Sequence, residues 1–362
     1  MPRLPVRRRG LGRHGEPPRL AAGNASGPAK PLARRLFGGI TLVALVLAAT
    51  AAAAVDGPYK DVSQHANAAA PRITMRAADG SVLLLPEVKA HGRTLIWAFA
   101  TGECGAERWG PFESRRFAES NVPAFVAAGV DYIVSTGGEA GIFTCASDAG
   151  MQRFVALYDS PRLAGLDFDI EGKQTPEQID SLVQRAKALA LQRPGLRLSF
   201  TLATHGSGDG SRRSLNPTGE AVLASIKRHR LDSAIINLMV MNYGPADTRW
   251  CVLRDGGSPP ACDMGRSALQ AAHNVQTKYG VPYAQIALTA MPGENDVAGN
   301  VTSLADAALI NRGARDLQLA GVHWWSLDRD RPCAAGSPRV SPHCHALPGV
   351  AAGAFGAAFI KP

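Results

Sequence analysis

Three acidic residues alternate with apolar residues in one short segment of the sequence, residues 165–172. The acids occupy every second position, as Asp167, Asp169 and Glu171. Strict alternation predicts a β-strand whose successive side chains point to opposite faces, so the three carboxylates share one face. Negative charges held close together raise one another's pKa values, which is a property of sites that transfer protons. This segment is therefore the first candidate for an active site.

The acidic segment has two other interpretations. An edge strand with a solvated acidic face would also alternate, but the apolar face needs a partner and glycines bracket the segment. Three carboxylates would also suit a hard cation. No His or further acid lies at ligand spacing, so we expect neither a metal ion nor another cofactor.

The elements that must position these carboxylates follow a βα pattern from Tyr59 onward. Eight strands are predicted, at residues 59–62, 94–99, 132–135, 163–170, 196–202, 235–241, 285–290 and 322–327. Helices are predicted between them, for example over residues 175–192 and 303–319. Eight such units favour an α/β fold of the (β/α)8 TIM-barrel type in a single domain, since no Gly-x-Gly-x-x-Gly follows the first strand. The connection over residues 63–92 is long, and a helix or an extra strand is expected inside it.

The first 55 residues differ in composition from the rest of the chain. Residues 1–35 form a basic, Pro- and Arg-rich tail with nine Lys and Arg and one Glu, which accounts for +8 of the net charge of +9. The remaining chain is almost neutral, which argues against a nucleic-acid partner. Residues 36–55 resemble a secretory signal peptide with an A-x-A type cleavage site, and Arg34-Arg35 offers a weak twin-arginine motif. We expect a secreted or periplasmic protein whose folded domain covers residues 56–362. An uncleaved membrane anchor is the alternative.

Six cysteines in an exported chain favour disulfide bonds. Fifteen pairings are possible, and no Cys-x-x-Cys suggests metal binding or redox work. Proximity in the sequence favours the pairs Cys251–Cys262 and Cys333–Cys344, which leaves Cys104–Cys145. We interpret them as structural cross-links between loop residues.

Five segments together resemble glycoside hydrolase family 18, the chitinases and their relatives. Residues 165–172 resemble the family's Asp-x-x-Asp-x-Asp-x-Glu motif, and residues 135–138 resemble its Ser-x-Gly-Gly motif. Residues 237–244 are similar to its Met-x-Tyr strand, and residues 325–330 to its closing Trp strand. Residues 289–296 are similar to a motif of the bacterial subgroup. The order of the segments matches the family over nearly the whole mature chain.

The resemblance implies a retaining hydrolase of β-1,4-linked N-acetylglucosamine polymers that uses the acetamido group of its own substrate. Glu171 is expected to act as general acid and then general base. Asp169 is expected to hydrogen-bond the acetamide N–H, and Asp167 to share a proton with its neighbours. Tyr243 is expected to hydrogen-bond the acetamide oxygen.

The resemblance also implies a set of substrate contacts. Trp325 is expected to form the floor under the sugar, with a core position as its alternative and Trp324 in the role if the strand phase shifts by one residue. The further expected contacts are Phe99, Gly138, Met241, Asn242 and Asn295. Packing in the wall is the alternative for Met241, and capping of a loop is the alternative for Asn295.

Two positions depart from the family pattern. Ala164 replaces the first Asp of the acidic motif, and activity is expected to survive this change. Asn242 stands where the bacterial subgroup has Asp, so an acceptor is kept and a charge is lost. Rate, pH optimum or substrate preference is expected to shift.

The expected partner is chitin or an N-acetylglucosamine oligosaccharide, and the expected state is a monomer. A near alternative is an endo-β-N-acetylglucosaminidase that cleaves the core of N-glycans. A sugar-binding barrel without catalysis is less favoured, because Glu171 is present together with both aspartates. A two-carboxylate glycosidase would need a second acid at another strand end, for which Glu103, Glu139 and Glu294 are available without a matching motif.

Overall fold

The computed structural model describes residues 54–64, 71–75, 84–85, 88 and 94–361. These residues belong to one compact unit, Thr50–Pro362. The predicted basic tail and almost all of the predicted signal segment lie outside the described residues, so their assignments stay predictions. Among the described helices, none is both long and apolar enough to cross a membrane.

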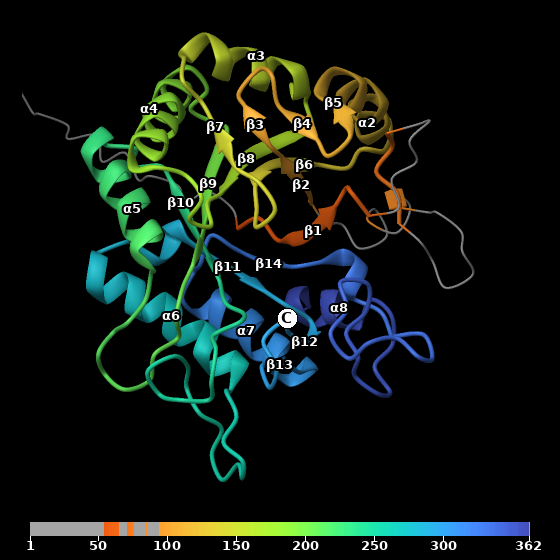
Figure 1. The fold of residues 1–362 in the computed structure, drawn as a ribbon, viewed down its shortest axis with the longest axis vertical. Coiled ribbons are helices and arrows are strands. Elements are labelled where there is room, and N and C mark those ends of the chain that lie inside the picture. Colours follow the sequence, from red (N-terminus) through yellow and green to blue (C-terminus); the bar gives the residue numbers. More distant parts are fainter. Residues whose placement is uncertain (1–53, 65–70, 76–83, 86–87, 89–93, 362) are drawn as a thin grey trace, which may run out of the picture. The chain divides into compact units, whose positions relative to one another are not determined.

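Eight parallel strands close into a barrel in the order β1, β14, β11, β10, β9, β8, β6, β2 (Figure 1). The strands are β1 Gly57–Asp61, β2 Leu95–Ala100, β6 Tyr132–Gly137, β8 Leu163–Asp169, β9 Arg197–Ala203, β10 Ile235–Met239, β11 Ile286–Ala290 and β14 Gly321–Trp324. This confirms the predicted (β/α)8 fold and all eight strands. The predicted ends of β10 and β14 were two and three residues too late, because the chain turns into loops before its apolar run ends, and the predicted end of β6 was two residues too early.

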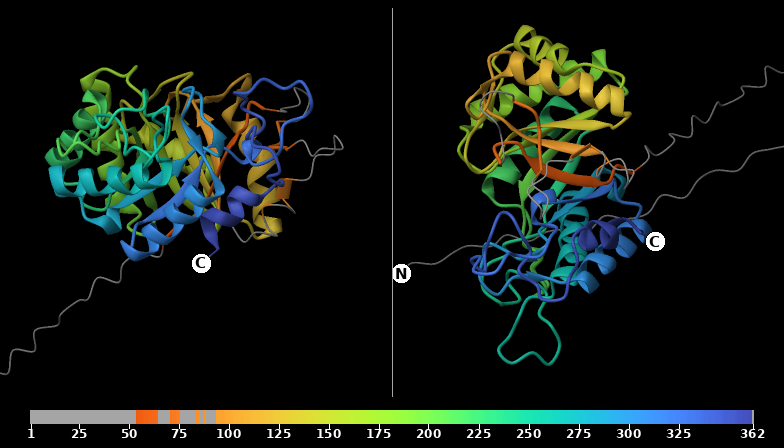
Figure 2. Two further views of the ribbon diagram at one scale, coloured as in Figure 1. Left: turned by 90° about the horizontal axis from the view of Figure 1, so that it is seen from below. Right: turned by 90° about the vertical axis from the view of Figure 1, so that its right-hand side faces the viewer.

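Helices surround the barrel (Figures 1 and 2). They are α2 Ser114–Ala128, α3 Asp148–Tyr158, α4 Pro176–Gln192, α5 Pro217–His229, α6 Met264–Tyr279, α7 Leu304–Asp316 and α8 Ala354–Ile360. The two predicted helices are confirmed as α4 and α7, and each begins with a capping box, formed by Thr175 and by Ser303. Leu84 and Leu85 are helical, as expected for the long connection after β1, most of which lies outside the described residues.

Short two-stranded sheets lie in the loops that follow the barrel strands. β3 Gly102–Glu103 pairs with β7 Phe143–Thr144, and β4 Arg108–Trp109 pairs with β5 Phe112–Glu113. β12 Gly293–Glu294 pairs with β13 Val301–Thr302 after β11. A long loop between β10 and α6 projects away from the barrel, drawn in teal in Figure 1 and in the right-hand view of Figure 2.

The alternation in β8 distributes its side chains between two environments. Leu166, Phe168 and Ile170 belong to the apolar layer between the barrel and the helices. Asp167 and Asp169 take the opposite face, toward the barrel interior, as the sequence pattern predicts. The three predicted disulfides, Cys104–Cys145, Cys251–Cys262 and Cys333–Cys344, are all present.

Candidate active site

A cleft of about 410 Å³ opens where the barrel strands end. Each of the eight strands, or the loop that follows it, contributes at least one residue to the lining. Asp169 and Glu171 both line this cleft, whereas Asp167 lies below them. The acidic segment is thus placed at the carboxyl end of the barrel, where barrel enzymes build their active sites.

Asp167 is buried and completely hydrogen-bonded. Its Oδ1 accepts hydrogen bonds from the hydroxyls of Ser199 and Thr201, both at 2.7 Å. Its Oδ2 accepts from Tyr59 at 2.9 Å and from Ser135 at 2.6 Å. Four hydroxyl donors match the four acceptor positions of the two carboxylate oxygens. No hydrogen bond between Asp167 and Asp169 is found among the described residues, so the predicted sharing of a proton stays a prediction.

Asp169 differs from Asp167 in the hydrogen bonding of its carboxyl group. It is buried, and its Oδ1 has no hydrogen-bond partner within the described part of the chain. Burial raises its pKa well above the ordinary range, and the negative charges of Glu171 and Asp167 raise the pKa further. A buried carboxyl oxygen without a partner is unfavourable, and a ligand that donates a hydrogen bond would relieve that cost.

Glu171 lies two residues beyond the end of β8 and is only partly buried. Burial raises its pKa first, the charge of Glu139 raises it further, and the charge of Lys173 opposes both effects. Glu139 also lines the cleft. A carboxyl group whose pKa is raised in this way can hold a proton closer to neutral pH and deliver it to a substrate.

An aromatic surface borders the carboxylates. Trp325 lines the cleft and stacks on Phe99 with 5.3 Å between ring centroids, and Tyr59 meets the edge of Trp325 at 6.1 Å. Trp324 is fully buried and stacks on Phe359 in the helix layer. The structure therefore places Trp325, and not Trp324, in the cleft.

Gly138 lies behind this aromatic surface and is not part of the cleft lining. Its φ is +78°, and a Cβ atom at this position would come within 2.7 Å of the Phe99 ring. The expected contact of Gly138 with substrate is therefore corrected. The residue lets Phe99 approach the backbone closely, and Phe99 itself lines the cleft.

Tyr243 was also expected in the cleft, and the structure places it elsewhere. Its side chain is buried in the layer between barrel and helices, and its hydroxyl has no hydrogen-bond partner among the described residues. The cause lies one residue earlier, where Asn242 adopts the left-handed conformation with a φ of 51°. This turn ends the alternation of the strand, so Met239 and Met241 line the cleft and Tyr243 does not.

Asn295 is likewise displaced from its expected contact. It is fully buried, and its Nδ2 donates to the carbonyls of Met291 at 3.1 Å and Gly293 at 3.0 Å. It caps the loop after β11, and the neighbouring Asp296 lines the cleft instead. Asn242 lines the cleft as expected, and its side chain accepts a hydrogen bond from the backbone N–H of Val297 at 3.0 Å.

The two curated relatives of this chain are both named as chitinases. No protein-family model matches the sequence. The chain is 30% identical over 244 residues to the probable bifunctional chitinase/lysozyme of Escherichia coli K12, which covers 63% of this chain and 26% of that protein. It is 30% identical over 233 residues to endochitinase 11 of Metarhizium anisopliae, which covers 59% of this chain and 43% of that protein. The chain thus spans less than half the length of these curated relatives.

A solved structure agrees with the fold. The catalytic domain of a hyperthermophilic chitinase from Pyrococcus furiosus superposes with a TM-score of 0.62 at 22% identity, over 85% of this chain and 94% of that one. The acidic segment lies at the mouth of a barrel with this shared fold. Both curated relatives and this solved structure are named as chitinases, the class of enzyme that the five sequence segments resemble.

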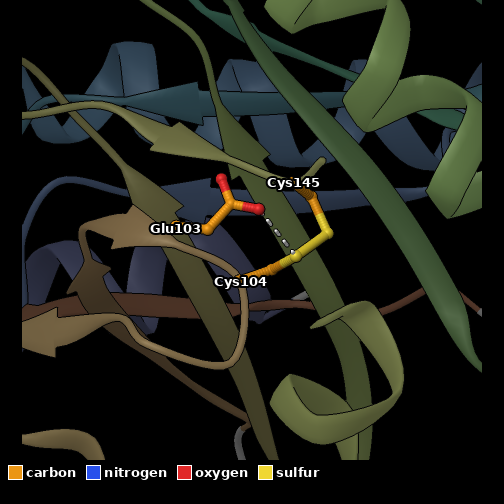
Figure 3. A group of neighbouring side chains, drawn as sticks. All are labelled: Glu103, Cys104 and Cys145. Carbon is orange, nitrogen blue, oxygen red and sulfur yellow. Dashed lines mark hydrogen bonds between the residues drawn. A yellow bond between two sulfur atoms is a disulfide. The ribbon is translucent and has the colours of Figure 1, made fainter. Parts of the chain in front are cut away.

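The barrel also carries a cluster of metal-ligating residue types outside the cleft, formed by Glu103, Cys104 and Cys145 (Figure 3). The two cysteines are joined in a disulfide, so neither offers a thiolate to a metal ion. The Glu103 carboxylate accepts hydrogen bonds from Thr144 Oγ1 and from the backbone N–H of Ala146, both at 2.6 Å. Glu103 therefore holds a loop and is not a second acid in the cleft.

Glu294 is also not a second acid in the cleft, because it pairs with Arg339 at 2.7 Å and is not part of the cleft lining. Of Glu103, Glu139 and Glu294, Glu139 alone lines the cleft. Tyr59 and His205 also line the cleft, and neither was predicted from the sequence. Tyr59 could have been found by counting inward positions along the first strand, whereas His205 follows a strand end and had no such signal.

Proposed function

We propose that this protein hydrolyses β-1,4-linked N-acetylglucosamine polymers, either chitin or its oligosaccharides, with retention of anomeric configuration. The observation that carries the proposal is the pair formed by Glu171 and Asp169 in one cleft. Burial and neighbouring charge raise the pKa of both carboxyl groups, and one oxygen of Asp169 has no hydrogen-bond partner among the residues that the structure describes. The curated relatives are named for chitin hydrolysis, which supports the same class of substrate.

In the first step Glu171 donates its proton to the glycosidic oxygen, and the bond from that oxygen to the anomeric carbon breaks. The carbonyl oxygen of the substrate's acetamido group attacks the anomeric carbon from the other face and forms a cyclic oxazolinium ion. Asp169 accepts a hydrogen bond from the acetamide N–H and compensates the positive charge. The sugar chain beyond the broken bond departs as an alcohol.

In the second step the Glu171 carboxylate takes a proton from a water molecule. The resulting oxygen nucleophile attacks the anomeric carbon, opens the oxazolinium ring and restores the acetamide. Two inversions at one carbon give net retention. Asp167, held by four hydroxyl groups, supplies a fixed negative charge below Asp169.

The walls of the cleft fit the apolar and polar faces of a sugar. Trp325 and Phe99 offer an aromatic floor for the C–H face of a ring, and Met239 and Met241 extend the apolar wall. Asp296 offers hydrogen-bond acceptors at the rim. Its Oδ1 lies 3.2 Å from the guanidinium of the buried Arg329, and its Oδ2 accepts from Asn242 at 3.3 Å.

We also propose that the protein acts outside the cytoplasm, as a monomer, either released or held by its N-terminal segment. Three disulfide bonds support an oxidising compartment. Mass measurement of the mature N-terminus after expression in the native host would test cleavage after Ala54, and light scattering of the purified chain would test the monomer.

Hydrolysis of defined substrates tests the proposed activity. The full chain is incubated with N-acetylglucosamine tetramer and pentamer and, separately, with a glycopeptide that carries an N-glycan, and the products are identified by mass spectrometry. Shorter N-acetylglucosamine oligomers are the expected products. Cleavage of the glycopeptide alone would replace the substrate class, and tight binding without cleavage would replace the enzyme by a sugar-binding barrel.

A further inference from the structure

One histidine in the cleft has no part in the mechanism above. His205 follows the end of β9, lines the cleft and is only partly exposed. Its Nδ1 is buried, and neither ring nitrogen forms a hydrogen bond with a described residue. A polar ring that lies in a binding cleft without hydrogen-bond partners can form a hydrogen bond with a ligand without breaking one inside the protein.

Two further side chains support the His205 ring from behind. The ring lies 4.8 Å from the ring of Trp250, centroid to centroid, at a tilt of 59°. The guanidinium carbon of Arg213 lies 4.7 Å from the centroid of the same Trp250 ring. We call these three residues the His205 wall. The contacts fix the direction of the imidazole, although it has no hydrogen bond of its own.

The backbone of the His205 wall is cross-linked in several places. The N–H of Gly206 donates to the Trp250 carbonyl at 3.0 Å, which ties the loop after β9 to the loop after β10. Asn274 on α6 donates from Nδ2 to the carbonyls of Ser207 at 3.1 Å and Arg213 at 3.2 Å. The disulfide Cys251–Cys262 closes the loop next to Trp250. A wall with this many links is organised before any ligand arrives, which lowers the entropic cost of binding.

The strand order sets the His205 wall apart from the aromatic floor. In the closed ring of eight strands β9 lies four places from β1, and β2 and β14 flank β1. Phe99 and Trp325 come from β2 and from the end of β14, so the floor and the His205 wall lie on opposite sides of the barrel mouth. The carboxylates of β8 stand beside β9 in this ring. A sugar chain longer than the unit on Trp325 can therefore reach His205.

The charge state of His205 suits a neutral ligand. Burial lowers the pKa of the imidazole, and the positive charge of Arg213 lowers the pKa further. The ring is thus neutral at pH 7, with one N–H donor and one acceptor nitrogen. A sugar hydroxyl or an acetamido group, each of which both donates and accepts, is complementary to such a ring.

We propose that His205 is a further substrate-binding residue, which hydrogen-bonds a sugar unit of the N-acetylglucosamine chain beyond the unit on Trp325. The inference rests on the proposed function for its class of ligand. Trp250 and Arg213 are positioning residues that hold the imidazole and do not contact the sugar. His205 therefore sets how many sugar units the cleft recognises.

The test measures binding without turnover. Oligomers of two to six N-acetylglucosamine units are titrated calorimetrically into the full chain carrying Glu171→Gln, alone and together with His205→Ala. His273→Ala is the matched control, because that histidine is exposed on α6 and bonds Tyr283 away from the cleft. His205→Ala should weaken the binding of the longer oligomers about three- to tenfold, as expected for one hydrogen bond, and leave the shortest oligomer unchanged.

A conservative variant separates contact from structure. His205→Gln keeps a donor and an acceptor, so it should recover part of the affinity that His205→Ala loses. Trp250→Phe keeps an aromatic ring behind the imidazole, so it should keep most of the affinity of the protein with His205 unchanged. Equal affinities for His205→Ala and His273→Ala at every length would overturn the inference and leave the proposed function intact. Length-dependent loss in a protein that cleaves no oligomer would support the inference while the proposed hydrolysis fails. Binding of no oligomer by any variant would overturn both.

Discussion

Tyr59 on β1 donates a hydrogen bond of 2.9 Å to Asp167 on β8. The two strands are three places apart in the closed sheet, so the bond crosses the barrel interior. It completes the set of hydroxyl donors around Asp167, whereas Oδ1 of Asp169 has no hydrogen-bond partner among the described residues. On the proposed function, these two aspartates have different tasks: Asp167 supplies a fixed charge, and Asp169 accepts a hydrogen bond from the ligand.

Asp169→Asn tests the acceptor. The change keeps the shape of the side chain but removes the charge that compensates the oxazolinium ion, so kcat/KM for the tetramer should fall about 10²- to 10³-fold. Asp232→Asn is the matched control, because this exposed aspartate offers only its backbone carbonyl to a described partner. Equal rates for the two variants would remove Asp169 from the mechanism.

The pH dependence of the rate should follow the charges around Glu171. The general acid must be protonated, so the rate declines as pH rises through its pKa. Glu139→Gln removes a negative charge that raises this pKa, and the decline should move to lower pH. Lys173→Met removes a positive charge that lowers it, and the decline should move to higher pH.

The pair of variants is measured as kcat against pH on the same oligomer. Opposite displacements identify Glu171 as the group that titrates. Displacements of the same sign, or none in either variant, would assign the falling limb to another group.

The two neighbouring tryptophans should separate binding from stability. Trp325→Ala removes part of the floor of the cleft, so the dissociation constant for the tetramer should rise roughly tenfold or more. Trp324→Ala opens a cavity in the buried helix layer, so the free energy of unfolding should fall by about 3–5 kcal/mol. Titration calorimetry and urea unfolding of both variants check the assignment. An exchange of the two phenotypes would show that the strand phase is wrong.

A buried ion pair behind the cleft offers a test of stability. Lys60 Nζ lies 2.8 Å from Asp328 Oδ2, and the two side chains are 0% and 3% exposed. Lys60→Met leaves the Asp328 charge buried and unpaired, so the free energy of unfolding should fall by about 3–5 kcal/mol. Adding Asp328→Leu should recover most of that loss. Urea unfolding at pH 7 measures both, and a loss as large in the double variant as in the single one would mean that Lys60 acts by packing alone.

Local sequence patterns were sufficient to predict much of the fold. The alternation at residues 165–172 predicted the strand and the shared face of Asp167 and Asp169, because a strand has a fixed period of two. The caps at Thr175 and Ser303 marked the starts of α4 and α7. Proximity of the cysteines in the sequence was enough to select the observed disulfide pairs.

The period of two along a strand gave a wrong prediction where a strand ended. The period of two would put Tyr243 on the face of Met239 and Met241, but the left-handed backbone at Asn242 turns it into the helix layer. Asn295 was misplaced for a related reason, since the carbonyl groups of its own loop satisfy it.

Local sequence patterns also could not predict contacts in the cleft between residues that are distant in sequence. The influence of Glu139 on Glu171 and the stacking of Phe99 on Trp325 depend on the closed barrel, which brings separate strand ends together.

The measurement that bears most directly on the central claim is proton NMR of the products released from N-acetylglucosamine pentamer by the full chain and by its Glu171→Gln variant. The glutamine keeps the shape of the side chain and lacks the proton. The wild type should first release the β-anomer, and the variant should bind the pentamer but release no product at a detectable rate. Initial release of the α-anomer, or unchanged release by the variant, would contradict the retaining, acetamide-assisted mechanism with Glu171 as its acid.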